Sequence, residues 1–535
     1  MPSLVGPVPA VEAPAPSPSP AAASSPRASS PAPGPAASRP AGSPPPGPAA
    51  GRRARPAVAH VAARLRTTPG TIRAAVTACA LAAAVLATVI AVAFSGVAGG
   101  LSAMGGTDAP EVTAATGLYF SLNDMDAQVA NVMLAGTDGA LAGDRPQYLA
   151  TYASDRQTAY ADLQQAAVTA AGNPAAQRQL QSVLVNVGKY EALAADALLA
   201  EQQAAGTSAS GPTPGGAASG TPSEAVGYYR QATGLMRTAI LPQVSSLATV
   251  SSDKLDGSYA AGRSDAIAGA VIALVAGILL VALLVAFQVF LSRRFRRTVC
   301  PALAAATAAA LALTIVTAGR LDAEASHLTV AKQDTFDSIV ALSQARAISY
   351  AANADESRYL ADPGRAAAYQ QSFLAESQQL ASVGNVPLAQ YEPTLAAGFA
   401  AYQANNADVR FGGYLGAEFR NITFPGERAA AVAALRAFLF YEQDDHRLRQ
   451  LASTNPEAAA QFDTSMAPGQ SDWAFDQYDK ALVAVIGINQ GAFTAAVAAG
   501  EGSAVGWNGL VPGGCALLIV ALVLLGARPR LAEYR

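Results

Sequence analysis

The sequence predicts an all-α membrane protein with four transmembrane helices and two extracytoplasmic helical-bundle domains in tandem. Three observations support this fold class. Four long apolar stretches contain no Asp, Glu, Lys, Arg or His, and basic residues are concentrated in the short segments outside them. The two long blocks between these stretches are rich in Ala, Gln, Leu, Glu and Arg, which favour helices.

The apolar stretches cover residues 74–98, 266–291, 298–319 and 507–526. A helix crosses a hydrocarbon core of about 30 Å with roughly 20 residues, so each stretch is long enough to span a membrane. The first is too long, and begins too far along the chain, for a cleaved signal peptide, which makes it a signal anchor. The absence of ionisable side chains from all four argues against a transporter or a proton pump.

The distribution of charge predicts the orientation in the membrane. The segments 1–73, 292–297 and 527–535 hold 15 of the 35 basic residues and 2 of the 38 acidic ones. Basic residues in short loops stay in the cytoplasm, so both termini are expected there and the blocks 99–265 and 320–506 outside. The blocks keep 20 basic and 36 acidic residues, which argues against nucleic acid as a partner.

The short loop between the second and third spans is strongly basic. Its arginines fix the topology and attract the anionic headgroups of the lipid bilayer. They also form a candidate docking site for a cytoplasmic protein. The four residues are Arg293, Arg294, Arg296 and Arg297.

Two segments are predicted to lack a fold of their own. The N-terminal tail, residues 1–73, is dominated by Pro, Ala, Ser and Gly over most of its length and is expected to be disordered. Residues 206–222 have a similar composition and are expected to form a flexible linker inside the first block.

Proline-containing dipeptides divide the two blocks into helices. Each block is expected to hold four to six of them, in an up-down bundle whose first and last helices continue into the membrane. The expected breaks in the first block are Arg145-Pro146 and Asn173-Pro174, with a kink at Pro242. Those in the second block are Asp362-Pro363, Val386-Pro387, Phe424-Pro425-Gly426, Asn455-Pro456 and Ala467-Pro468.

Motifs for catalysis or metal binding are not evident. Cys79, Cys300 and Cys515 lie in or beside the spans, which leaves neither disulfides nor thiol chemistry for the blocks. The segment 442–447 is the only carboxylate–histidine cluster, and no second histidine is near it. We therefore expect no catalytic, cofactor-binding or metal-binding residue, no cofactor and no enzymatic activity.

One dense polar stretch in the second block is a candidate ligand- or partner-binding face. On a helix, Arg346, Tyr350 and Asn353 share one side, while Asp355 can pair with Arg358. The alternative is a solvated helix with local ion pairs, which the sequence alone favours because such pairs are common on exposed helices.

Several segments resemble an actinobacterial family of four-span membrane proteins, the GlnX type. The resemblance covers roughly residues 70–530. It implies a protein that links an extracytoplasmic glutamine-binding-type lipoprotein to the cytoplasmic serine/threonine protein kinase G. No functional residue is carried over, because none of the segments is a chemical signature. The segments are 118–126, 346–363, 421–428, 478–480 and 488–490.

The expected function is transmembrane signal transduction without enzymatic activity. The short cytoplasmic segments leave no room for a kinase or cyclase domain, so the output requires a separate partner, such as a kinase. The expected extracytoplasmic partner is a solute-binding lipoprotein that senses an amino acid. Two alternatives remain open: a scaffold of the cell envelope, and a direct small-molecule receptor, which requires a polar pocket.

Overall fold

The computed structural model shows a chain in which every described regular element is a helix, so the predicted all-α class is confirmed. Some predictions concern residues outside the described ones. These are the N-terminal tail up to residue 67, most of the linker, Arg296 and Arg297. Residues 62–535 form one compact unit. The described ranges are 68–137, 141–170, 173–208, 223–295 and 300–532.

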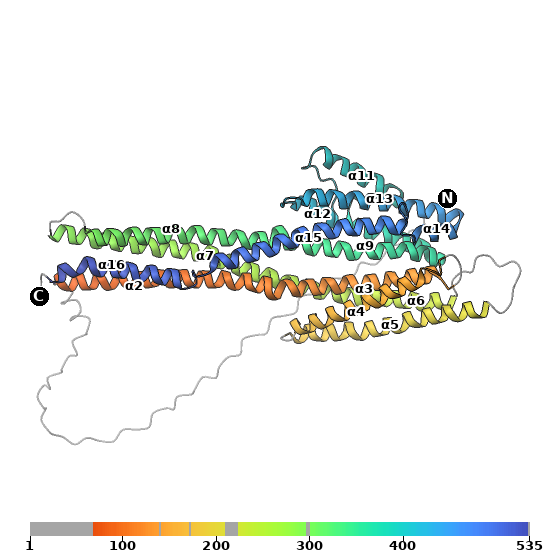
Figure 1. The fold of residues 1–535 in the computed structure, drawn as a ribbon, viewed down its shortest axis with the longest axis horizontal. Helices are drawn as coiled ribbons and strands as arrows, with labels where there is room; N and C mark the ends of the chain where they lie inside the picture. The colour runs from red at the N-terminus through yellow and green to blue at the C-terminus, as the bar shows by residue number, and fades with distance from the viewer. Residues whose placement is uncertain (1–67, 138–140, 171–172, 209–222, 296–299, 533–535) are drawn as a thin grey trace, which may run out of the picture. The chain divides into compact units, whose positions relative to one another are not determined.

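The first half of the chain contains six α-helices and two π-helical segments among its described residues (Figure 1). Prolines mark two of the starts, since α4 has Pro146 in its first turn and α5 begins at Pro174. The elements are α2 (Thr68–Ala103), η1 (Met104–Asp108), α3 (Ala109–Ala135), α4 (Arg145–Thr169), α5 (Pro174–Ser208), α6 (Ser223–Leu235), η3 (Met236–Ile240) and α7 (Leu241–Phe295).

The second half follows the predicted proline breaks and adds others. Loops that proline did not predict lie near Asn405 and between residues 505 and 509. The elements are α8 (Pro301–Thr329), η4 (Val330–Phe336), α9 (Asp337–Ala361), the 3-10 helix η5 (Pro363–Arg365), α10 (Ala366–Leu380), α11 (Leu388–Ala404), α12 (Gly413–Asn421), α13 (Glu427–Thr454), α14 (Pro456–Asp463), α15 (Ser471–Ala504) and α16 (Leu510–Ala532).

Three helices run without a break from an apolar segment into a block. The π-helical segment η1 joins α2 to α3, η4 joins α8 to α9, and α7 itself extends back through η3 into α6. The fourth connection was predicted to be continuous, and that prediction is wrong. Gly506 has a φ of 81°, a left-handed conformation that glycine adopts readily and that ends helices, and it separates α15 from α16.

Five helical stretches are long and apolar enough to cross a membrane, where four were predicted. The predicted spans lie in α2, α7, α8 and α16, and the additional stretch is α15. The first half of α15 packs Phe475, Tyr478 and Leu482 into the core of the second block. These long apolar helices fit a membrane protein.

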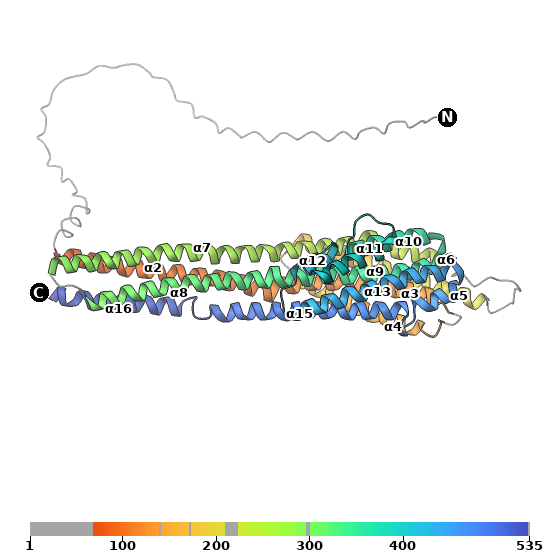
Figure 2. The same ribbon diagram turned by 90° about the horizontal axis from the view of Figure 1, so that it is seen from above.

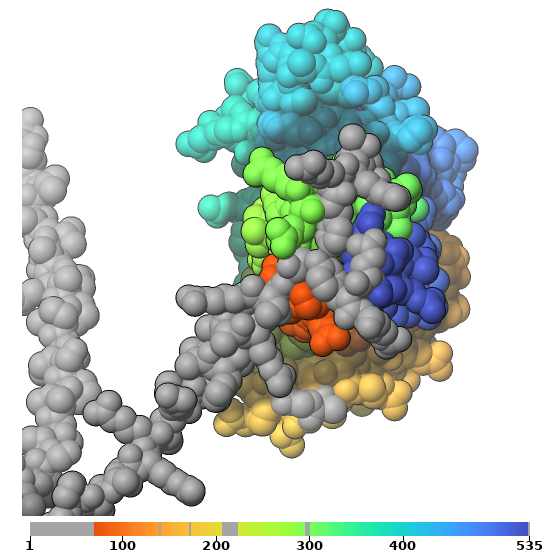
Figure 3. Space-filling view, turned by 90° about the vertical axis from the view of Figure 1, so that its left-hand side faces the viewer, coloured from red at the N-terminus to blue at the C-terminus, as the bar shows by residue number. Residues whose placement is uncertain are grey.

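The four helices that carry the predicted spans pack as a group. Helix α2 contacts α7 and α16, and α8 contacts the same two helices. Figure 3, which views their ends, shows the colours of α2, α7, α8 and α16 gathered together. Large apolar side chains on these helices are exposed, among them Leu81, Ile278, Leu279, Ile315 and Leu517, as expected for surfaces that face lipid.

Small residues bring these helices close together. A Cβ atom added at Gly269 would overlap Ala93 of α2, and one added at Gly277 would overlap Thr314 of α8. Between the two glycines, Ala273 is buried. Gly269, Ala273 and Gly277, spaced four residues apart, therefore form a close contact surface on α7.

The two blocks pack against each other along α3 and α9. These helices lie side by side in Figures 1 and 2 and are in extensive contact. Around them, α3 also contacts α4 and α7, whereas α9 also contacts α10, α12 and α15. The shared interface places the polar stretch of α9 against the first block.

Candidate functional site

A group of charged side chains, all buried except the half-buried Arg237, joins the two blocks, and we call it the inter-block ion cluster. Its members are Asp126 of α3, Arg237 of η3, Asp355 and Arg358 of α9, and Glu376 of α10. Two come from the first block and three from the second. The cluster lies where α3 and α6–α7 meet α9 and α10.

Arg358 is the centre of this cluster. Its side chain is 2% exposed, and its guanidinium lies 2.6 Å from a carboxylate oxygen of Asp126 and 2.5 Å from one of Asp355. Its Nε donates to the Tyr229 hydroxyl at 2.8 Å. A buried guanidinium is stable only with such partners, because its desolvation penalty is large.

The carboxylates of the cluster have further partners. Asp126 accepts hydrogen bonds from Tyr190 at 3.1 Å and from Thr233, both in the first block. Asp355 lies 3.1 Å from Arg237, which also pairs with Glu376. The chain of contacts therefore alternates in charge across the interface.

Neighbouring contacts reinforce the same interface. Arg230 of α6 forms a bidentate pair with Asp362, at 2.8 and 2.5 Å. Ser357 lies 2.7 Å from Asn131 of α3. At the end of the blocks, the Tyr148 hydroxyl donates to the carbonyl of Thr464 at 3.1 Å.

The structure places all five residues of the predicted face in contact with other helices. Asp355 and Arg358 form the predicted pair, but inside the inter-block ion cluster. Arg346 makes a bidentate pair with Asp479 of α15, at 2.5 and 2.8 Å, and Asn353 donates to Asp472 at 3.4 Å. The alternative of a solvated helix is therefore wrong for this stretch.

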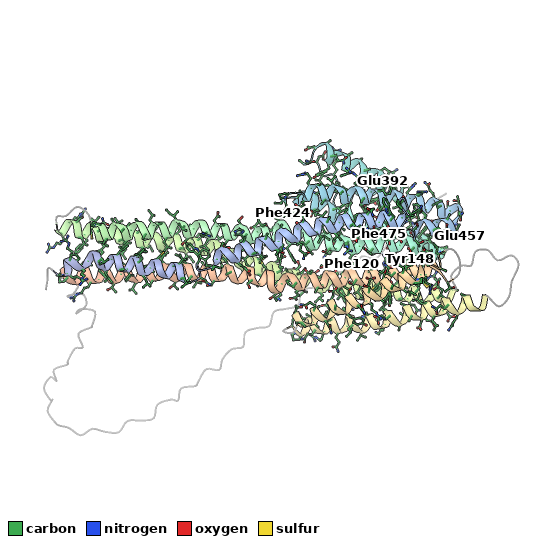
Figure 4. The ribbon with its side chains drawn as sticks, viewed as in Figure 1. Phe120, Tyr148, Glu392, Phe424, Glu457 and Phe475 are labelled. Atoms are coloured by element: carbon green, nitrogen blue, oxygen red, sulfur yellow. The ribbon has the colours of Figure 1, made fainter. Side chains whose placement is uncertain are left out.

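Tyr350 occupies an aromatic contact between the blocks. Its ring lies 4.9 Å from that of Phe120 on α3 and 4.8 Å from that of Phe475 on α15, both in edge-to-face geometry. The guanidinium of Arg346 lies 4.1 Å from the centre of the Phe120 ring. Figure 4 labels Phe120 and Phe475 in the middle of the blocks.

Burial sets the protonation of Glu376. Desolvation, followed by the charge of Asp355, raises the pKa of this carboxyl from 4.5 to about 8, against the opposing effect of Arg237. Desolvation likewise raises the pKa of Asp472 to about 7, and it raises that of Glu356 well above its usual range. Burial in and beside the interface therefore raises the pKa of several carboxyl groups to neutral pH or above.

A second polar layer surrounds α7 where the blocks meet the apolar segments. Lys254 of α7 lies 3.2 Å from Asp108 in η1 and 2.8 Å from Glu111 in α3. On the other side, Lys332 in η4 lies 2.6 Å from Asp256 of α7. The π-helical segments η1 and η4 therefore both form ion pairs with α7.

The remaining predicted residues lie at the opposite end of α7. Arg293 and Arg294 occupy its last turn and are exposed, so they are available to lipid headgroups or to a protein. Among the described residues, no group of three or more His, Cys, Asp or Glu side chains is arranged to hold a metal ion.

Sequence reasoning missed Asp126, Arg237 and Glu376. Asp126 could have been found, because it interrupts the apolar stripe of Leu118, Leu122 and Val129 at helical spacing, and all four side chains are buried. Glu376 carries a similar signal, because it lies in the next α-helix and interrupts the apolar stripe of Tyr369, Phe373 and Leu380. Arg237 is far from α9 in sequence and carries no comparable signal.

Comparison with known proteins gives one match. A family model described as an actinobacterial sensor domain matches residues 100–260, which cover the first block from the end of α2 into α7. No curated protein and no solved structure gives a significant match. The match supports a sensor-type actinobacterial protein with a role in sensing or signalling.

Proposed function

We propose that the protein is a non-enzymatic transmembrane signal transducer. Its outer blocks would bind an extracytoplasmic solute-binding protein loaded with an amino acid, and its inner helix ends would report this state to a cytoplasmic partner such as a Ser/Thr kinase. Both termini would lie in the cytoplasm, and four helices would cross the membrane.

The observation that carries this proposal is the ion pair between Asp126 and Arg358. It joins α3 to α9, and these helices continue without a break into α2 and α8. A change in how the blocks pack would therefore move two membrane helices relative to each other. Rigid helices that shift or rotate at an interface are an established form of signal transmission.

The composition of the interface supports the same function. Apolar cores lie on each side of it, within each block, whereas the contact between the blocks is rich in ion pairs and hydrogen bonds. Interfaces of this polar kind resemble those between domains that move relative to each other. The sensor-domain match to the first block agrees with this assignment.

The test is co-purification of the full chain from native membranes, with and without added amino acids. We expect a solute-binding lipoprotein and a cytoplasmic kinase whose recovery changes with one amino acid. The matched control is the chain with Arg293 and Arg294 replaced by Gln, which should keep the lipoprotein and lose the kinase. Recovery of the same partners under all conditions would contradict signalling and favour the scaffold.

A further inference from the structure

A cavity of about 120 Å³ lies between the two blocks, beside the inter-block ion cluster. Its walls come from α3 and α7 on one side and from α9, α10 and α12 on the other. Three of these helices, α3, α7 and α9, are continuous with the apolar segments that the protein is proposed to place in the membrane.

The polar groups that line this cavity are uncharged. Six of the eight lining residues carry an uncharged polar group, four a hydroxyl and two a primary amide, and such groups can both donate and accept hydrogen bonds. They belong to Thr116, Tyr119, Ser245, Tyr414, Gln344 and Gln379. The Thr116 hydroxyl already donates to the carbonyl of Val112, so it is left as an acceptor. Ala248 and Ile348 complete the lining with apolar surface.

Nearby charges do not favour a charged ligand. Arg237 is the cation that acts on Tyr119, and it is already paired with Asp355 and Glu376. An ionised ligand would therefore lose its hydration without gaining a counter-charge, which is unfavourable. An uncharged molecule with several hydroxyls on a short carbon chain matches both the donors and acceptors and the apolar wall.

The volume limits the size of such a ligand. It equals the space of about four water molecules at roughly 30 Å³ each. We propose that this cavity binds a small uncharged polyol. This site is additional to any solute carried by the extracytoplasmic partner, and a polyol bound there would act directly on the packing of the two blocks.

A bound polyol would also affect the π-helical segment η4 indirectly, through α12. Tyr414 lies in α12, and Asn421 at the end of the same helix donates to the carbonyls of Gln333 and Asp334 in η4, at 3.1 and 3.3 Å. A displacement of α12 would thus be passed to the segment that joins α8 to α9. The site is placed to bias signalling.

The test is saturation-transfer NMR with erythritol as the probe and the purified full chain in lipid nanodiscs. We expect transfer to erythritol in the parent chain and its loss in Ala248→Leu, which fills the cavity. The matched control is Ala260→Leu on the exposed side of α7, which should retain the signal. Tyr414→Phe should weaken binding about fivefold, the effect of one lost hydrogen bond.

Two results would overturn the site: no transfer in the parent chain, or equal transfer in the parent chain and in Ala248→Leu. If Ala248→Leu does not fold, erythritol binding is measured in Tyr414→Phe and Gln344→Leu instead. Undiminished binding in both variants contradicts the proposal. Because no partner protein is present, this outcome is independent of whether the proposed lipoprotein and kinase bind.

Discussion

Replacing Arg358 with Met is expected to destabilise the protein by about 3–5 kcal/mol, the effect of removing one partner from a buried ion pair. Arg358 is almost completely buried and contacts both Asp126 and Asp355. Its loss leaves Asp126 with hydrogen bonds from Tyr190 and Thr233 but without a counter-charge. Chemical unfolding of the full chain in detergent micelles, followed by circular dichroism, measures the change.

An exposed ion pair provides the control for this experiment. Lys480 pairs with Asp476 at 2.6 Å on the surface of α15, with its side chain 68% exposed. Lys480→Met should change stability by no more than about 1 kcal/mol, since surface pairs contribute little. The double variant Asp126→Asn with Arg358→Met should be more stable than Arg358→Met alone. Equal effects of Arg358→Met and Lys480→Met would show that the cluster does not hold the blocks together.

The second large effect is a loss of stability as the pH rises from about 5 to 8. Glu376 has a folded-state pKa of about 8 against an ordinary value of 4.5. Between these values the folded chain holds a proton that the unfolded chain has released, so unfolding becomes easier as the pH rises. One such proton contributes a slope of at most about 1.4 kcal/mol per pH unit. Asp472, with a pKa of about 7, acts in the same direction.

Glu376→Gln isolates the contribution of this group. Relative to the parent chain, the variant should gain stability as the pH rises through this window, because Gln cannot ionise. The exposed Glu457→Gln on α14 is the matched control and should follow the parent chain at every pH. Chemical unfolding at pH 5.5 and pH 8 measures the stability of both variants. If the stability difference between Glu376→Gln and the parent chain were the same at both pH values, the raised pKa of Glu376 would be refuted.

Much of the fold follows from local sequence signals. Uncharged apolar stretches long enough to span a bilayer, and prolines at helix starts such as Pro174 and Pro456, need no knowledge of distant contacts. The break at Gly506 was not predicted, although Glu501 and Ser503 lie among glycines just before it and weaken the helical pattern there. In the structure, Gly506 adopts a left-handed conformation that ends the helix.

The candidate site was less predictable. The stretch from Arg346 to Arg358 attracts attention by its charge, and Asp355 and Arg358 pair as their three-residue spacing suggests. Its burial could not be predicted, because the residues that cover it come from α3 and η3, more than a hundred positions earlier in the chain. From sequence alone, an Arg on a polar helix is predicted to face solvent, because the distant carboxylate that pairs with it in the fold is not known.

The central claim is that packing between the blocks controls the inner ends of the membrane helices. Spin labels at Arg73 on α2 and Ala305 on α8, with the three native cysteines replaced, report the inner distance by pulsed electron paramagnetic resonance in nanodiscs. A second pair, at Gln231 on α6 and Arg365 in η5, reports the outer interface; all four positions are exposed. In Asp126→Asn, which weakens the link between α3 and α9, both distance distributions should change. An altered outer distance with an unchanged inner distance would contradict the account.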